Sequence, residues 1–155
     1  MSEQTQYMSQ EKIEELKSEL QDLKNNKAPQ LRKRIDEARQ MGDLSENAEY
    51  HQAREELAWI QSRIGEINVI LDNAEVIAAG GDGSGSVSIG STVRVEVGNK
   101  EKEFLIVGAQ EANPLEGKIS NESPLGSAFL GKNEGERVEV KAPSGRQIYK
   151  ILKVG

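Results

Sequence analysis

Two carboxylates, Asp43 and Glu46, lie three residues apart in a short polar run from Gly42 to Tyr50, and they are the strongest candidates for chemistry in this chain. Carboxylate oxygens are ligands that Mg²⁺ prefers, but the ion takes six ligands in an octahedron. Two carboxylates cannot fill that shell. We therefore expect a metal held by this run alone to bind weakly, with another macromolecule supplying the remaining ligands.

A structural role for the same two acids is the alternative. Asp43-Leu44-Ser45-Glu46 matches a helix capping box with Asp in place of Ser or Thr, in which Asp43 accepts from the backbone near Glu46 and Glu46 reaches back. Each acid would also interact favourably with the helix dipole, by about 0.3–1 kcal/mol. The spacing alone leaves both interpretations open.

The segments on either side of the run carry a helical apolar repeat, and these segments must position the acids. Apolar residues recur three and four apart in two groups before the run, Ile13, Leu16, Leu20 and Leu23 and then Leu31, Ile35 and Ala38, and without interruption after it, at Ala53, Leu57, Ile60, Ile64, Ile67, Leu71 and Ala74. This spacing is typical of a coiled-coil seam. It predicts an antiparallel helical hairpin with the acids at its tip.

The first helix of this hairpin has a predicted start, end and interruption. Ser9 is the expected N-cap, with Glu11 in the first turn, and the helix should run to about Met41. Pro29 removes one helical hydrogen bond, and Lys27 occupies an expected apolar position. We therefore predict a kink or short break at residues 25–29.

After residue 77 the pattern changes to alternation, which is typical of strands. A Gly/Ser-rich stretch over residues 78–88 reads as a linker. Strands are predicted over residues 93–97, 104–107, 138–141 and 147–154. Ser123, Pro124 and Gly131 predict a short helix between the second and third of them. The fold class is therefore α+β: an antiparallel α-helical coiled-coil hairpin over residues 1–77, the linker, and a small antiparallel β-sheet domain with a short helix over residues 89–155.

Composition narrows the function classes. The 155 residues include no cysteine, which rules out disulfides and cysteine-ligated metal sites. No apolar run approaches a membrane span and no secretion signal is evident, so we expect a cytoplasmic protein without a membrane partner. The net charge of −6 argues against a generally basic nucleic-acid binder.

The charge is nevertheless uneven along the hairpin. Residues 1–80 hold 10 Lys and Arg against 16 Asp and Glu, whereas residues 81–155 hold 10 of each. Within residues 24–39 the balance reverses, because Lys24, Lys27, Arg32, Lys33, Arg34 and Arg39 accompany only Asp36 and Glu37. This basic patch close to the acidic run is a candidate anion-binding surface. Its alternative is an ordinary solvated helix face.

The run from Gly42 to His51 resembles the tip motif of the GreA/GreB family of bacterial transcript cleavage factors. The resemblance covers essentially the whole chain. It includes Ala28-Pro29 and Ile35 to Arg39 before the tip, and Ser123 to Gly126, Leu130 to Lys132 and Val138 to Val140 after the linker, in what looks like the family's FKBP-like C-terminal domain. The negative charge and modest basic patch favour the GreA branch.

The resemblance implies an accessory factor rather than an enzyme. Its coiled coil would enter the secondary channel of bacterial RNA polymerase as a monomer, with the C-terminal domain on the channel rim. Asp43 and Glu46 would be ligands, in trans, for a catalytic Mg²⁺ with which the polymerase cuts the 3′ end of backtracked nascent RNA. Arg39 and Arg54 match basic positions of the family and would contact RNA phosphates.

Two other function classes remain open. The FKBP-like resemblance suggests a peptidyl-prolyl isomerase, but Phe104, Phe129 and Tyr149 are too few aromatic residues to favour its pocket. A channel-binding relative that blocks polymerase without stimulating cleavage should lack or rearrange the tip acids, and both are present here. Tyr50 falls on the apolar seam and is predicted to be a buried aromatic, whereas His51 lies off the seam and is expected to be solvated.

Overall fold

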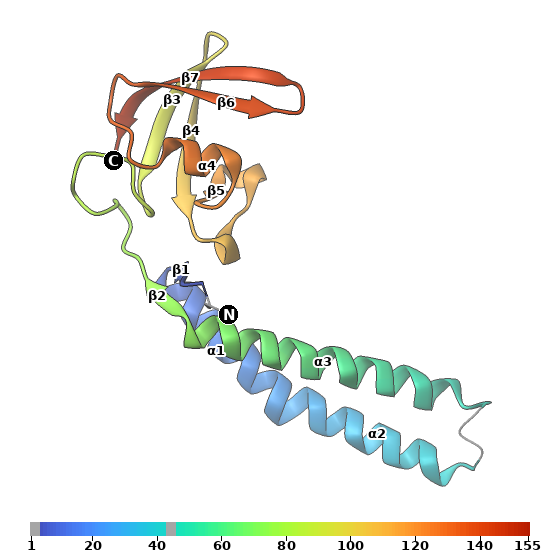
Figure 1. Cartoon of the computed structure of the whole chain (residues 1–155). Helices are drawn as coiled ribbons and strands as arrows, with labels where there is room; N and C mark the ends of the chain where they lie inside the picture. Colours follow the sequence, from blue (N-terminus) through green and yellow to red (C-terminus); the bar gives the residue numbers. More distant parts are fainter. Residues whose placement is uncertain (1–3, 43–45) are drawn as a thin grey trace. The chain divides into compact units, whose positions relative to one another are not determined.

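A computed structural model describes residues 4–42 and 46–155 of the chain, in two compact units (Figure 1). One unit is Ile13–Asn73, and the other combines the N-terminal residues up to Lys12 with Ala74–Gly155. This division differs from the predicted boundary at residue 77, because the first residues of the chain belong with the C-terminal part.

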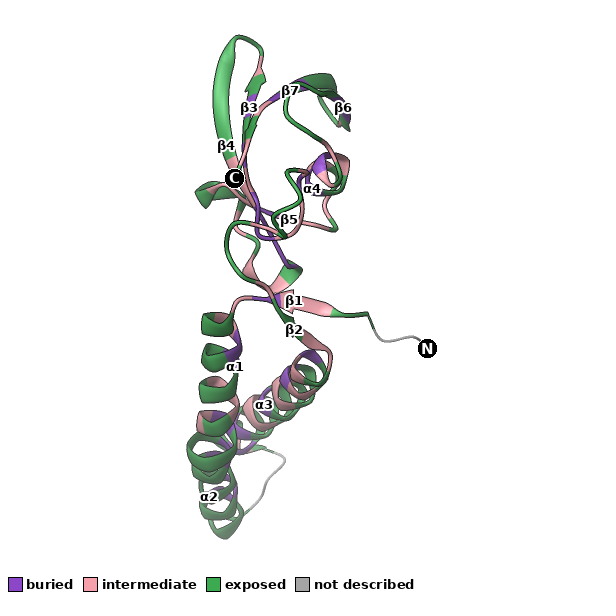
Figure 2. Cartoon of the chain, turned by 90° about the vertical axis from the view of Figure 1, so that its left-hand side faces the viewer, coloured by how far each residue is buried: buried purple, intermediate pink, exposed green. Residues whose placement is uncertain are grey.

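The unit Ile13–Asn73 is the predicted helical hairpin. Its first arm comprises α1 (Gln10–Asp22), the π-helix η1 (Leu23–Lys27) and α2 (Ala28–Gln40), and its second arm is α3 (Ala48–Asp72). Figure 1 shows α2 and α3 side by side. Every predicted seam residue within the two arms is buried or partly buried, Leu16 and Ala53 to 1% exposure, whereas the outer faces are exposed (Figure 2). The predicted coiled-coil seam is therefore confirmed.

A widened helical turn replaces the break that was predicted at residues 25–29. The N–H of Ala28 donates to the carbonyl of Leu23, five residues earlier, which is the hydrogen bond of a π-helix. The buried stripe thereby passes from Leu23 to Ala28, while Lys27 stays exposed. Pro29, which has no N–H to donate, is accommodated at the start of α2. The predicted irregularity is therefore present, as a widened turn at Leu23–Lys27 and not as a break, and the extra residue in that turn restores the seam.

The C-terminal part folds as a five-stranded sheet with one short helix. The strands β3 (Thr92–Val97), β4 (Lys100–Val107), β5 (Lys118–Ser120), β6 (Arg137–Ala142) and β7 (Gly145–Val154) lie in the order β5-β4-β3-β7-β6. All neighbouring strands are antiparallel except β4 and β5, which are parallel. The four predicted strands are confirmed, and the sheet is mixed rather than wholly antiparallel.

The short helix α4 (Pro124–Phe129) confirms the predicted cap and supplies the centre of the core. The N–H of Gly126 donates to Ser123 Oγ at 3.1 Å. Phe129 is fully buried against the sheet, among residues that include Val93, Ile106 and Ile151. Two 3₁₀ turns, η3 (Ala109–Glu111) and η4 (Pro114–Glu116), join β4 to β5.

A small two-stranded sheet ties the N-terminus to the C-terminal part and was not predicted. The strand β1 (Gln6–Met8) pairs in parallel with β2 (Ala74–Val76). Ser9 Oγ accepts from the N–H of Lys12, as predicted for the cap of α1, and its hydroxyl donates to Glu111. Three-residue strands are too short for alternation to be recognised in the sequence.

The stretch predicted as a linker, residues 78–88, is hydrogen-bonded to the sheet domain. The N–H of Val87 donates to the carbonyl of Lys132 at 2.8 Å, and the N–H of Gly131 donates to the carbonyl of Val87 at 2.8 Å. The Val87 side chain is part of the buried core. Residues 78–88 are thus an ordered segment, in which glycines such as Gly83 and Gly85 form turns with positive φ.

Two glycines provide a matched stability prediction. A Cβ on Gly126 would lie 1.9 Å from the carbonyl oxygen of Ser120, whereas a Cβ on Gly65, inside α3, would meet nothing within 4 Å. We expect Gly126→Ala to destabilise the sheet domain by about 1–3 kcal/mol and Gly65→Ala to stabilise the hairpin by about 0.5–1 kcal/mol. Thermal unfolding followed by circular dichroism measures both, and a neutral Gly126→Ala would contradict the close approach.

Candidate functional site

Asn47 caps α3 at the tip of the hairpin and links the two arms. Asn47 Oδ1 accepts from the N–H of Tyr50 at 3.2 Å, which makes Asn47 the N-cap of α3. Its Nδ2 donates to the carbonyl of Ala38 at 3.4 Å and so links the two arms. Asp43 lies outside the described residues. Asn47 is thus the N-cap of α3. The predicted capping box of Asp43 and Glu46 includes residues outside the described ranges and stays a prediction.

Glu46 is left with its carboxylate exposed, just before the N-cap of α3. It makes no hydrogen bond or ion pair with any residue that the structure describes. Residues 4–42 and 46–155 contain no cluster of three His, Asp or Glu side chains that could hold a metal ion. An exposed carboxylate can serve as one ligand of a metal whose other ligands come from elsewhere.

A groove on one side of the hairpin, close to the tip, gathers arginines from both arms. We call it the arginine groove; it has a volume of about 380 Å³ and is lined by Arg32, Ile35, Asp36, Arg39, Arg54, Leu57, Ala58 and Gln61. Arg39 approaches Asp36 at 3.9 Å. Arg32 and Arg54 form no ion pair with a described residue. Three guanidinium groups thus accompany one carboxylate, which gives the groove an excess of positive charge.

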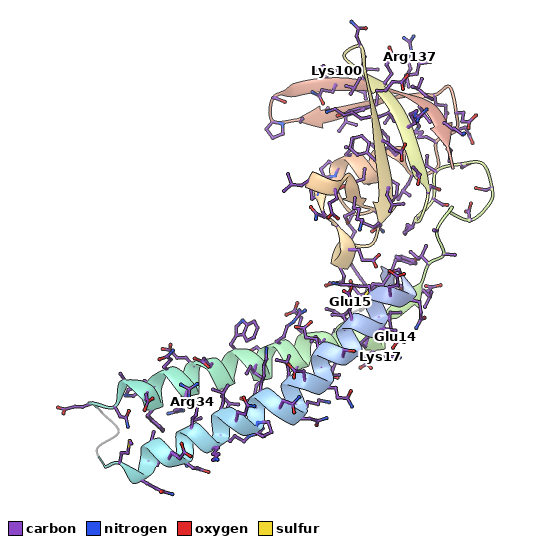
Figure 3. All side chains as sticks on the ribbon, turned by 180° about the vertical axis from the view of Figure 1, so that it is seen from behind. Glu14, Glu15, Lys17, Arg34, Lys100 and Arg137 are labelled. Carbon is purple, nitrogen blue, oxygen red and sulfur yellow. The ribbon has the colours of Figure 1, made fainter. Side chains whose placement is uncertain are left out.

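A second groove on the hairpin provides a contrast. This tryptophan groove is lined by Lys27, Gln30, Leu31, Arg34, Glu56, Trp59 and Ile60. Its basic groups have acidic partners, because Arg34 lies 3.5 Å from Glu56 and Lys27 lies 3.8 Å from Asp22. Arg34, labelled in Figure 3, lies between α2 and α3 in that view. The predicted basic patch is therefore divided: Lys27 and Arg34 are paired with acids, whereas Arg32 and Arg39 line the arginine groove.

Tyr50 contacts Arg54, one of the two arginines that were predicted to bind RNA. Its ring is 7% exposed on the seam, which confirms the predicted burial. Arg54 Nη1 donates to the Tyr50 hydroxyl at 3.4 Å, and the guanidinium carbon lies 5.7 Å from the ring centroid. Burial acts to raise the pKa of Tyr50, but hydrogen bonds and positive charge from Arg39 and Arg54 outweigh it, so the pKa is lowered.

The sequence interpretation missed this contact, although a signal was available. Tyr50 and Arg54 are four residues apart on one helix, where side chains meet. Arg39 comes from the other arm, so its approach to Tyr50 depends on how the arms pair. The structure therefore places Arg39 and Arg54 in one groove and Arg54 against Tyr50, whereas His51 is exposed, as expected.

The aromatic residues of the sheet domain contact one another. The ring centroids of Phe104 and Phe129 are 6.0 Å apart, and those of Phe129 and Tyr149 are 5.5 Å apart. Phe129 and Tyr149 are core residues and Phe104 is packed against that core. These rings serve packing, which gives no support to an isomerase pocket.

An exposed acid and an arginine groove near the tip of a helical hairpin, on a chain that also carries a small mixed sheet, are typical of an adaptor that offers side chains to a larger partner. Residues 6–76 match the family described as "Transcription elongation factor, N-terminal", and residues 82–155 match "Transcription elongation factor, GreA/GreB, C-term". The chain belongs to the GreA/GreB family of transcription elongation factors. Within the described residues, no helix is long and apolar enough to cross a membrane.

Individual relatives agree over nearly the full length. Transcription elongation factor GreA of Lachnoclostridium phytofermentans is 44% identical over 156 residues, which cover 99% of this chain and 98% of that protein. The factor of the same name from Leuconostoc mesenteroides is 46% identical over 151 residues, which cover 96% and 94%. A solved structure of the transcription factor Gfh1 is 26% identical, covers 99% of both chains and has a TM-score of 0.47.

Proposed function

We propose that this chain binds bacterial RNA polymerase during elongation, inserts its hairpin into the secondary channel and stimulates the polymerase's own Mg²⁺-dependent cleavage of backtracked RNA. The observation that carries the proposal is at the tip, where Asn47 caps α3 and Glu46, one residue earlier, is exposed to a partner. Family membership supports the same assignment. The chain would act as an accessory factor in the cytoplasm, not as an enzyme.

Each part of the chain has a distinct task in this proposal. Glu46, with Asp43, offers carboxylate oxygens to a Mg²⁺ of the polymerase active site. When bound there, the metal would activate a water and stabilise charge on the attacking and leaving oxygens. Arg39 and Arg54 hold phosphates of the extruded RNA. The sheet domain grips the rim of the channel and keeps the hairpin at high local concentration.

A purified backtracked polymerase complex tests the proposal directly. The RNA is labelled at its 3′ end, and release of short fragments is followed with and without this chain. We expect release to be stimulated in the presence of Mg²⁺ and to require a cleavage-competent polymerase. Slower elongation without fragment release would instead assign the chain to the channel-blocking class. Catalysis of proline isomerisation by the full chain, without release, would favour the isomerase.

The arginine groove supplies a separate prediction about RNA capture. The double variant Arg39→Ala, Arg54→Ala should weaken cleavage most for long backtracked segments, because two phosphate contacts are lost. Each lost contact should flatten the log–log dependence of activity on salt by about 0.7, the value for single strands. Crosslinking of the factor to the RNA 3′ end, measured over a salt series, gives an independent readout.

Arg34→Ala is the matched control for this prediction. It also removes a hairpin arginine, but Arg34 lies in the tryptophan groove and is paired with Glu56. We expect it to keep wild-type crosslinking and salt dependence. A double variant that crosslinks as well as the wild type would make the arginine groove an ordinary solvated surface.

A further inference from the structure

We propose that Tyr50 is a positioning residue that holds Arg39 and Arg54 as one phosphate-binding pair beside the arginine groove. The inference rests on the proposed function, in which these two arginines meet the extruded RNA. Tyr50 itself would not touch the RNA, since its ring is buried on the seam between the arms. Its part is to fix the direction of two guanidinium groups that come from different helices.

The positions of the three residues bring them together at the tip end of the hairpin. Tyr50 stands in the first turn of α3 and Arg54 in the next, while Arg39 is in the last turn of α2. The Asn47 side chain caps α3 and also donates to the carbonyl of Ala38 in α2, so it connects the two arms at the tip of the hairpin. The phenol therefore faces cations from two elements whose mutual register is fixed by a hydrogen bond.

Two properties of the phenol suit it to this task. Its hydroxyl oxygen accepts from Arg54 Nη1 at 3.4 Å, and its ring face attracts the same guanidinium at 5.7 Å. The positive charge of Arg39 also acts on the Tyr50 hydroxyl and helps to lower its pKa, and Arg39 lines the same groove as Arg54. Two guanidinium groups in one groove repel one another. The phenol holds Arg54 in place without adding a negative charge that would repel a phosphate.

The other interactions of Arg39 and Arg54 show how much Tyr50 contributes to ordering their side chains. Arg39 otherwise has Asp36, 3.9 Å away and largely exposed, where water weakens the attraction. Arg54 has no ion pair with a residue in the described ranges. Without Tyr50 both side chains would sample many rotamers, and RNA binding would have to order them. A preordered pair loses less entropy on binding, and so captures phosphate at a lower factor concentration.

The substitution Tyr50→Phe tests this inference, because it removes the hydroxyl and keeps the ring. In the cleavage assay with long backtracked segments, we expect the factor concentration for half-maximal stimulation to rise about three- to tenfold, in line with the net contribution of one ordinary hydrogen bond. The maximal cleavage rate should stay unchanged, because the tip acids are intact. Tyr149→Phe is the matched control, since Tyr149 is also buried and donates to Gln147 at 2.7 Å in the sheet domain.

A direct readout of arginine order accompanies the assay. In ¹⁵N NMR spectra of the full chain, the Nε signals of Arg39 and Arg54 should shift and lose dispersion in Tyr50→Phe, while those of Arg34 and Arg63 stay in place. Arg63 is held by Glu19 at 2.8 Å and therefore reports on the integrity of the hairpin. A change in Arg63 as well would indicate general loosening of the hairpin and overturn a specific positioning role.

The double variant Arg39→Ala, Arg54→Ala separates failure of this inference from failure of the proposed function. If the double variant cleaves and crosslinks like the wild type, the arginines do not bind RNA and the proposed RNA contact fails. If the double variant is defective but Tyr50→Phe matches the wild type in both assays, the positioning role is overturned. Adding Tyr50→Phe to the double variant should cause no further loss, because nothing remains for the hydroxyl to position.

Discussion

Glu46→Gln should abolish stimulated transcript cleavage while polymerase binding stays within about twofold of the wild type. The amide keeps the size of the side chain but removes the charge that a Mg²⁺ ligand needs. Asp43→Asn should have the same effect. Since Asn47 caps α3, neither change removes the helix cap, and the melting temperature of Glu46→Gln should match that of the wild type. Fragment release from a backtracked complex and competition binding to polymerase measure the two properties.

Glu49→Gln is the matched control for the tip acids. Glu49 is also an exposed acid close to the tip, in the first turn of α3 and three residues beyond Glu46. We expect Glu49→Gln to retain wild-type stimulation. The proposal attributes the defect of Glu46→Gln to the loss of a metal ligand and not to the lower negative charge of the tip. Full stimulation by Glu46→Gln, with normal polymerase binding, would show that Glu46 is not a metal ligand and would leave its exposure without a function.

The hairpin was predictable because its signal is long and periodic. Alternating three- and four-residue spacing continued through both arms, and burial of Leu16, Ala53 and Ile67 matches it. The one lapse, at Lys27, was also seen correctly as a disturbance. Its form was not predictable, because a π turn and a break both follow from the same missing apolar residue. Only the buried Ala28, one position later, distinguishes them.

The limits of the sequence are clearest where a residue has two local options. Asp43, Ser45 and Asn47 are all residue types that cap helices, and the capping box pattern favoured the first of them. The chain uses Asn47, whose amide also reaches the carbonyl of Ala38 on the other arm. That second contact depends on how the arms pair, so spacing along one segment could not reveal it.

For the candidate site, too, the sequence predicted some features, whereas others depend on how the two arms pair. Arg39 and Arg54 were named from the resemblance alone, and the structure places both in the arginine groove. Their meeting in one groove and the pairing of Arg34 with Glu56 both involve residues from different helices. Composition indicated a basic patch of six residues, whereas pairing across the hairpin decides which of them keep their charge available.

Separating the two units should reduce the potency of the hairpin by about two orders of magnitude or more. A fragment over residues 10–73 contains the whole hairpin with the tip, the arginine groove and Tyr50. We expect it to reach the same maximal cleavage as the full chain, but only at about 100-fold higher concentration, because a tethered second contact raises the effective concentration. Titration of both proteins against one backtracked complex gives the two half-maximal concentrations.

The design of the second fragment follows from the ordered path of residues 78–88. A fragment that starts at residue 89 would lack Val87, which is 2% exposed in the sheet core and pairs with Lys132 and Gly131. A fragment over residues 78–155 keeps this contact and should compete with the full chain for polymerase without stimulating cleavage. When the two fragments are mixed without a covalent link, we expect them to stimulate cleavage with the same low potency as the hairpin fragment alone, because the covalent tether is what raises the potency of the full chain. Equal potency of the hairpin fragment and the full chain, mole for mole, would show that the sheet domain contributes no grip on the polymerase.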